Sequence, residues 1–222
     1  MGQLGRAVAL FVSLMVGTLG AMSPPDVARG AGAASAQADV LIQAGHEGRP
    51  DCDREPATLC RNTGAAGEIQ WTPIVADEAT RILRAAGVTV IRRPAFLSGQ
   101  YNVKDAIFLH FDGNVRKCAT GASVGYPQRA HSAQAAAEWK ALWKRFIPFR
   151  FEPDNFTSTL SGYYGFKHVR SVSDAAIVIE GGEMTCPAQH AWMKNHLKFE
   201  GALIAHFVSA RIGKGNVPLP TP

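Results

Sequence analysis

Four short apolar runs recur along the chain. They cover residues 39–45, 88–92, 105–109 and 175–179 and are rich in valine, isoleucine, leucine and alanine. Runs of this length and composition predict strands that are buried in a sheet. Longer segments with helical spacing separate them, which is typical of an α/β domain. We therefore predict a single α/β domain in which helices flank a mostly parallel central sheet.

The first predicted helix covers residues 69–86. Its apolar positions recur at helical spacing and are Val75, Ala79, Ile82, Leu83 and Ala86. Pro73 fits this helix only within the first turn, because proline lacks the N–H that later turns need. Gly87 is suited to end the helix, since glycine readily adopts the left-handed conformation found there.

Three further helices are predicted in the second half of the chain. Ser132 is placed to cap a helix that ends before Pro148. A short helix is expected over 187–193 and a final helix over 197–212. Residues 149–173 are compatible with a short helix or with a loop beside a substrate.

The N-terminus resembles an export signal. Arg6 precedes an apolar stretch over residues 7–22, and small residues follow. We expect the mature protein to begin near Gln37 or Asp39. Because residues 23–38 are long for a cleavage region, earlier cleavage and an uncleaved anchor remain as alternatives.

These features predict three parts of the chain. Residues 1–38 form the signal peptide, 39–213 a single folded domain and 214–222 a flexible tail. No other stretch is long and apolar enough to cross a membrane, so we expect no stable membrane insertion once the signal is removed.

Composition and charge restrict the partners. Hydrophobic residues make up 46% of the chain, which is enough for a sizeable core. The formal net charge is +5, and removal of the predicted signal, which carries a net +1, leaves +4. That mild basicity suits an anionic surface such as a cell envelope, or it serves only solubility. No dense Lys/Arg block or nucleic-acid motif occurs, so no nucleic acid is expected as a partner.

The four cysteines predict two disulfides if the chain is exported. Three pairings are possible. Cys52 and Cys60 lie in one polar loop, so a local bridge between them is the simplest choice, and it leaves Cys118 to pair with Cys186. The rival hypothesis is a cysteine-ligated zinc, but no Cys-x-x-Cys spacing occurs.

Candidate chemistry gathers where the predicted strands end. His46 follows the first strand, His110 the third and Glu180 the fourth, while Glu68 begins the first helix. The carboxyl ends of parallel strands form the functional rim of such sheets. Two histidines and a carboxylate on one rim predict a metal site with a general base.

Each residue also has a simpler alternative role. Either histidine could make only an ordinary hydrogen bond, His110 to a neighbouring carbonyl. Glu68 could serve only to complement the helix dipole. Glu180 could form an ion pair with an arginine such as Arg92 or Arg170, because a carboxylate at the end of an apolar strand needs a partner.

Four segments, in order, carry a resemblance to a known family. Residues 40–48 (VLIQAGHEG) are similar to a "DAGHGG" motif, and Gly67-Glu68 precedes an amphipathic helix. Residues 108–113 (FLHFDG) and 176–182 (AIVIEGG) are similar to "SIHAN" and "vLvEtGF" strand ends. Together they resemble the zinc-dependent N-acetylmuramoyl-L-alanine amidases of the Amidase_3 type over roughly residues 39–213.

The resemblance implies a specific site and reaction. His46, Glu68 and His110 would be the ligands of a Zn²⁺ ion, with no other cofactor, and Glu180 the catalytic base. A zinc-bound water would cleave the amide between N-acetylmuramic acid and L-alanine in peptidoglycan or a muropeptide. Such an enzyme would be exported to the periplasm or the extracellular space, and we expect a monomer.

The chain departs from the family pattern beside these residues. Gln43 stands in place of the usual aspartate, which we expect to orient metal ligands, and Glu47 in place of a glycine. Residues 111–113 and Gly182 also differ from the pattern. Two alternatives therefore stay open: a related zinc hydrolase acting on another peptide or amide, and a non-catalytic envelope-binding protein with this fold.

Overall fold

The computed structural model describes residues 35–53, 56–170 and 175–222, and most of the predicted signal peptide lies outside these ranges. The strands are β1 (Ala36–Gln37), β2 (Val40–Ala44), β3 (Val90–Arg93), β4 (Tyr101–Asn102), β5 (Asp105–Asp112), β6 (Ser123–Gly125) and β7 (Ala176–Glu183). The helices are α1 (Ala57–Cys60), α2 (Glu68–Ala85), α3 (Ala130–Trp143), α4 (Ser158–Ser161) and α5 (Pro187–Ile212), with a 3₁₀ helix η1 (Tyr164–His168).

The central sheet has five strands in the order β3-β2-β5-β7-β6. The first four are parallel, and only β6 runs antiparallel to its neighbour β7. β1 and β4 form a separate two-stranded sheet. The prediction of one α/β domain with a mostly parallel, helix-flanked sheet is confirmed, and the parallel strands end at one edge.

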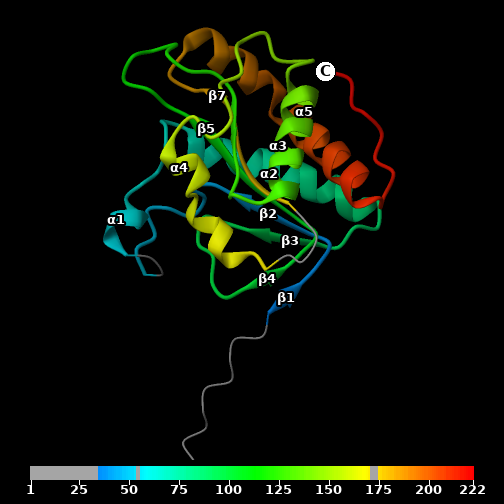
Figure 1. The fold of residues 1–222 in the computed structure, drawn as a ribbon. Coiled ribbons are helices and arrows are strands. Elements are labelled where there is room, and N and C mark those ends of the chain that lie inside the picture. Colours follow the sequence, from blue (N-terminus) through cyan, green and yellow to red (C-terminus); the bar gives the residue numbers. More distant parts are fainter. Residues whose placement is uncertain (1–34, 54–55, 171–174) are drawn as a thin grey trace, which may run out of the picture. The chain divides into compact units, whose positions relative to one another are not determined.

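Alternating side chains divide the sheet into two buried faces. Ile107 and Leu109 of β5 face a large core that α2, α3 and α5 cover, and these helices group on one side of the sheet (Figure 1). Ala106 and Phe108 face a smaller core, which the segment 160–169 closes. The candidate residues His110 on β5 and Glu180 on β7 therefore lie on the face that this thinner, irregular layer covers.

Two strands extend further than their apolar runs. β5 continues to Asp112, so His110 lies inside a strand rather than after it. β7 continues to Glu183, four residues beyond the apolar run that ends at residue 179. The polar ends of both strands are held by pairing with each other, with an irregularity between His110 and Asp112. The short strands β1, β4 and β6 were not predicted, because two or three residues carry no periodicity.

Three helix predictions need correction. Pro73 is the sixth residue of α2, not part of its first turn, so the helix tolerates one missing backbone hydrogen bond. Ser132 lies inside α3 and does not cap it; its hydroxyl accepts a hydrogen bond from the N–H of Ala176 at 3.1 Å. The two predicted C-terminal helices are one continuous helix, α5, because residues 194–196 include no helix breaker.

Both expected disulfides are present, Cys52–Cys60 and Cys118–Cys186. No helix in the described ranges is both long and apolar enough to span a membrane. The segment after α5 folds back onto the domain, where the N–H of Val217 donates to the hydroxyl of Ser209 at 3.0 Å.

Candidate metal centre

The structure brings His46, Glu68 and His110 together at the carboxyl edge of the sheet. One nitrogen or oxygen atom from each lies within 4.8 Å of the others, and all three side chains are buried. β2 delivers His46 through a sharp turn in which His46 itself has φ +59°, in the left-handed region. Glu68 is the first residue of α2, and His110 lies on β5.

The Glu68 carboxylate occupies the centre of this cluster. Its Oε1 atom lies 3.0 Å from Nδ1 of His110 and 3.5 Å from Nε2 of His46. Backbone donors fix both oxygens: the N–H of Ala65 donates to Oε2 at 2.8 Å and the N–H of Phe111 to Oε1 at 3.1 Å. The carboxylate is therefore held in place by the loop before α2 and by β5.

Gly64 makes room for this carboxylate. A Cβ atom built on Gly64 would lie 2.0 Å from Oε2 of Glu68 and 2.7 Å from Cδ2 of His46. Gly64 also has φ +71°, a conformation that favours glycine. The loop before α2 thus needs glycine at this position for both reasons.

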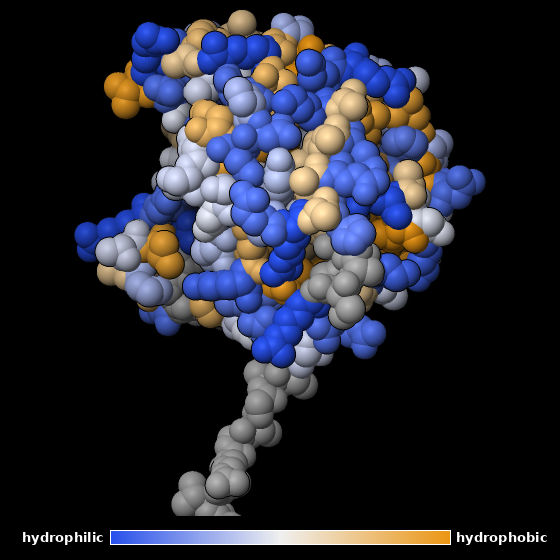
Figure 2. Space-filling model, in the orientation of Figure 1, coloured by the Kyte–Doolittle hydropathy of each residue, from blue (hydrophilic) through white to orange (hydrophobic). Residues whose placement is uncertain are grey.

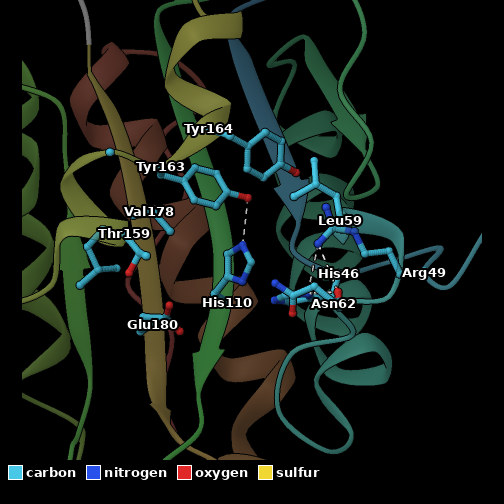
Figure 3. Close-up of a pocket in the computed structure, with 12 residues that line it drawn as sticks. His46, Arg49, Leu59, Asn62, His110, Thr159, Tyr163, Tyr164, Val178 and Glu180 are labelled. Atoms are coloured by element: carbon cyan, nitrogen blue, oxygen red, sulfur yellow. Dashed lines mark hydrogen bonds between the residues drawn. The ribbon is translucent and has the colours of Figure 1, made fainter. Parts of the chain in front are cut away.

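The two imidazoles present different nitrogens to Glu68. His46, which lies beside Asn62 in Figure 3, donates from Nδ1 to the carbonyl of Asn62 at 2.6 Å. This leaves Nε2 directed at Glu68. Nε2 of His110 lies 2.9 Å from the Tyr163 hydroxyl, which leaves Nδ1 directed at Glu68. A nearby guanidinium nitrogen of Arg49 also donates to the Asn62 carbonyl, at 3.2 Å.

Burial and charge set the protonation of the cluster. Burial, together with the neighbouring His110, lowers the pKa of His46 and favours its neutral form. Burial opposes ionisation of Glu68, but the hydrogen bond from His110 and the two imidazoles outweigh it and lower the pKa of that carboxyl. A carboxylate with imidazole nitrogens is a donor set that suits zinc, which takes three protein ligands in catalytic sites.

Glu180 faces the cluster from the neighbouring strand. It is the register partner of His110 across the β5–β7 ladder. Its Oε2 atom is buried and has no hydrogen-bond partner among the described residues. Burial raises the pKa of Glu180 well above its ordinary value, and the negative charges of Glu68 and Asp112 add to the effect. Such a carboxyl is suited to accept and release a proton.

Glu180 does not form the alternative ion pair with Arg92 or with Arg170. Arg92 binds Glu47 at 2.6 Å and Asp77 at 2.9 Å instead. Arg170 is exposed and pairs through its backbone N–H with the carbonyl of Tyr101.

Two cavities meet at this site. Their volumes are about 290 Å³ and 560 Å³, and they share the residues His46, Asn62, His110, Thr159 and Glu180. The smaller cavity continues toward α1 and η1, and the larger toward the loop that follows β5. Figure 2 shows a notch in the left edge of the molecule between the segment that carries α1 and the loop after β5. A substrate can therefore extend to both sides of the candidate centre.

The sequence predicted the polar side chains of the centre more readily than the residues that hold these side chains in position. Tyr163 lies in the segment 149–173, which the sequence left open as a short helix or a loop beside a substrate, and its hydroxyl contacts His110. Asn62 was not singled out, because it acts through its backbone carbonyl, for which the side-chain pattern gives no signal.

Comparisons with known proteins support the fold. No protein-family model matches the chain, and no curated protein sequence matches it significantly. Among solved structures, the N-acetylmuramyl-L-alanine amidase Ami1 from Mycobacterium smegmatis is similar with a TM-score of 0.59 and 16% sequence identity, over 80% of this chain and 97% of that one.

Two further solved structures have the same fold. The amidase AmiC2 of Nostoc punctiforme has a TM-score of 0.56 and 15% identity, over 81% of this chain and 98% of that one. The catalytic domain of the amidase CwlV from Bacillus (Paenibacillus) polymyxa var. colistinus has a TM-score of 0.56 and 15% identity, over 81% of this chain and 99% of that one. The chain therefore has the fold of N-acetylmuramoyl-L-alanine amidases.

Proposed function

We propose that this protein is an exported, zinc-dependent hydrolase that cleaves the amide between N-acetylmuramic acid and L-alanine in peptidoglycan. The observation that carries the proposal is the buried cluster of His46, Glu68 and His110, with Glu180 on the adjacent strand. The Oε2 atom of Glu180 has no hydrogen-bond partner in the part of the chain that the structure describes. The fold shared with solved amidases of that specificity supports the choice of substrate.

The cluster supplies the ligands. Nε2 of His46, the carboxylate of Glu68 and Nδ1 of His110 would hold the ion, since these atoms face one another. When bound, zinc polarises a carbonyl and lowers the pKa of a coordinated water to about 7. The Ala65 and Phe111 N–H groups keep the Glu68 carboxylate oriented throughout.

Glu180 handles the protons of the hydrolysis. Its carboxylate takes one proton from the attacking water, whose oxygen forms the new bond to the amide carbon. It then returns that proton to the nitrogen of L-alanine as the C–N bond breaks. Burial, which raises the pKa of Glu180, strengthens its carboxylate as the base of the first step.

The cavities and the disulfides support a cell-wall location. The two cavities leave room for a sugar on one side of the centre and a peptide on the other. Two disulfides suit the periplasm or the extracellular space, where thiols are oxidised.

We also propose that the signal is cut before Ala36. The strand β1 pairs with β4, and cleavage at Asp39 would remove β1 from the mature protein. The intact mass of the secreted protein tests this.

Metal content tests the centre directly. We expect about one zinc per chain in the wild type. The zinc should be lost in His46→Ala and in His110→Ala and retained in His131→Ala, which changes an exposed histidine of α3. An absence of zinc in the wild type, after metal is supplied during folding, would contradict the proposal.

Digestion of peptidoglycan tests the reaction. Glu180→Gln should keep the zinc and lose about 10²- to 10⁴-fold in the release of peptide amino groups from purified sacculi. Unchanged digestion by Glu180→Gln would exclude Glu180 as the base. The wild type could instead bind zinc, leave sacculi intact and hydrolyse another amide. That result would favour the alternative of a related zinc hydrolase.

A further inference from the structure

A chain of hydrogen bonds runs from the candidate centre into the smaller core. Nε2 of His110 lies 2.9 Å from the hydroxyl of Tyr163, and that hydroxyl lies 3.0 Å from Oε1 of Gln43. Nε2 of Gln43 donates to the carbonyl of Ala95 at 3.1 Å and to the hydroxyl of Tyr164 at 3.0 Å. Figure 3 shows Tyr163 above His110, with Tyr164 beside it.

The direction of every bond in this chain is determined. The carbonyl of Ala95 can only accept, so the Gln43 atom beside it must be the amide nitrogen and the other atom the amide oxygen. The amide oxygen can only accept, so the Tyr163 hydroxyl donates its single proton to it. Toward His110 the hydroxyl can then act only as an acceptor, and Nε2 of His110 must carry a proton.

Packing keeps the links of this chain in place. Gln43 is fully buried on β2. The Tyr163 ring packs against Phe108 at a centroid distance of 5.1 Å and against Tyr164 at 4.7 Å. A Cβ atom on Gly165 would lie 2.7 Å from Cε1 of Tyr163, so the backbone of Gly165 also packs closely against the Tyr163 ring. A hydroxyl fixed on both sides can select between the two tautomers of a histidine.

We propose that Gln43, acting through Tyr163, is a positioning residue that keeps the proton of His110 on Nε2 and so reserves Nδ1 for the metal. The inference rests on the proposed function and adds a source of ligand orientation within this chain. It gives Gln43 a role at the place where the amidase motif has an aspartate.

Loss of the chain has a specific chemical consequence. Without the Gln43 oxygen, as in Gln43→Leu, the Tyr163 hydroxyl is free to donate to Nε2 of His110. A histidine that accepts at Nε2 carries its proton on Nδ1, the atom that faces Glu68 and that zinc would need. In Tyr163→Phe the ring has no hydroxyl, so nothing accepts the Nε2 proton, and the Glu68 carboxylate, 3.0 Å from Nδ1, favours the proton on that atom instead.

Zinc affinity is the first measurement. Chelator competition should show affinity weakened about 10- to 100-fold in Tyr163→Phe and in Gln43→Leu, the range typical of lost partners of metal-bound histidines. Tyr101→Phe is the matched control. It removes a tyrosine hydroxyl from the same smaller core, where that hydroxyl accepts from Arg93 at 3.2 Å, and it leaves both the Gln43–Tyr163 and the Tyr163–His110 contacts, so its affinity should stay close to that of the wild type.

Nitrogen NMR of labelled histidine gives a readout that general destabilisation does not move. In the wild type we expect Nε2 of His110 to carry a proton both with and without zinc. In Gln43→Leu without zinc we expect that proton to be lost, while Nδ1, which lies 3.0 Å from the Glu68 carboxylate, is protonated in both proteins. Unprotonated Nε2 in the wild type, or unchanged zinc affinity in both variants, would overturn the proposal. Failure of the wild type to bind zinc would contradict the proposed function, while the metal-free spectrum would still decide the role of Gln43.

Discussion

The backbone of Gly45 lies directly against the imidazole of His110. A Cβ atom on Gly45 would come within 2.3 Å of Cε1, 2.4 Å of Nε2 and 2.5 Å of Nδ1 of that ring. Non-bonded carbon contacts are optimal at about 3.5–4.0 Å, so even a methyl group has no room. The turn after β2 therefore presents His46 and at the same time forms the surface on which His110 rests.

Gly45→Ala should displace His110. The ring cannot move without losing the Tyr163 hydroxyl or the Glu68 carboxylate, and we expect zinc affinity to fall at least about 10-fold. Overpacking should also lower the free energy of unfolding by about 1–3 kcal/mol. Chelator competition and urea denaturation measure the two effects.

Gly48→Ala is the control for a glycine replacement in the same loop. Gly48 has φ +84°, so alanine there is strained, but a Cβ atom would meet nothing within 4 Å. We expect a loss of stability of about 1–2 kcal/mol with zinc affinity unchanged. Equal zinc affinities in Gly45→Ala and the wild type would show that the close approach to His110 does not position the ring.

Glu183→Gln should destabilise the loop that follows β5. The carboxylate of Glu183 accepts from the N–H of Cys118 and the N–H of Thr120, both at 2.7 Å, and from the hydroxyl of Thr185. An amide presents an N–H to one of these donors, and we expect a loss of about 1–3 kcal/mol at neutral pH.

This loss should depend on pH in a known direction. Burial opposes ionisation of Glu183, but the hydrogen bonds outweigh it and hold the pKa below its ordinary 4.5. A lowered pKa contributes stability above the unfolded value and loses it as the pH falls through the folded value. The difference between wild type and Glu183→Gln in urea denaturation should therefore shrink in acid. A difference that does not change with pH would contradict the role of the ionised carboxylate.

The sequence predicted the sheet and the four polar side chains of the centre because both follow from local patterns. Apolar runs mark strands that are buried on two faces, and His46 and Glu180 follow or end such runs. The supports of the centre depend on tertiary contacts. Tyr163 lies 53 residues from His110, and nothing in the neighbourhood of either residue specifies that contact. The role of Glu183 was missed for the same reason: its donors come from a loop some 65 residues earlier.

Glu200 should make the protein less stable as the pH rises. It lies on α5 and is only 3% exposed, and burial raises its pKa to about 8. The folded protein then holds a proton that the unfolded chain releases near 4.5. The free energy of unfolding should consequently fall by about 1.4 kcal/mol per pH unit between these values and level off above 8.

Glu200→Gln should remove this slope, since an amide does not titrate. Denaturation midpoints of the two proteins, measured in urea from pH 5 to about pH 9, should diverge with the wild type losing stability. Glu138→Gln, an exposed position on α3, serves as the control and should keep the wild-type slope. Parallel curves for wild type and Glu200→Gln would contradict the raised pKa.

The two disulfides should contribute unequally to stability. Cys118–Cys186 closes a separation of 68 residues and Cys52–Cys60 one of only 8. Loop-closure entropy predicts a loss of about 4 kcal/mol when the first pair is replaced by serine and about 2.5 kcal/mol for the second. Urea denaturation of the two double variants measures the difference. Cys118 also anchors the loop that lines the larger cavity. Its variant should therefore lose a larger fraction of its activity on sacculi than of its bound zinc. A larger loss of stability for the short bridge would show that native-state contacts, rather than the entropy of the unfolded chain, determine what each disulfide contributes.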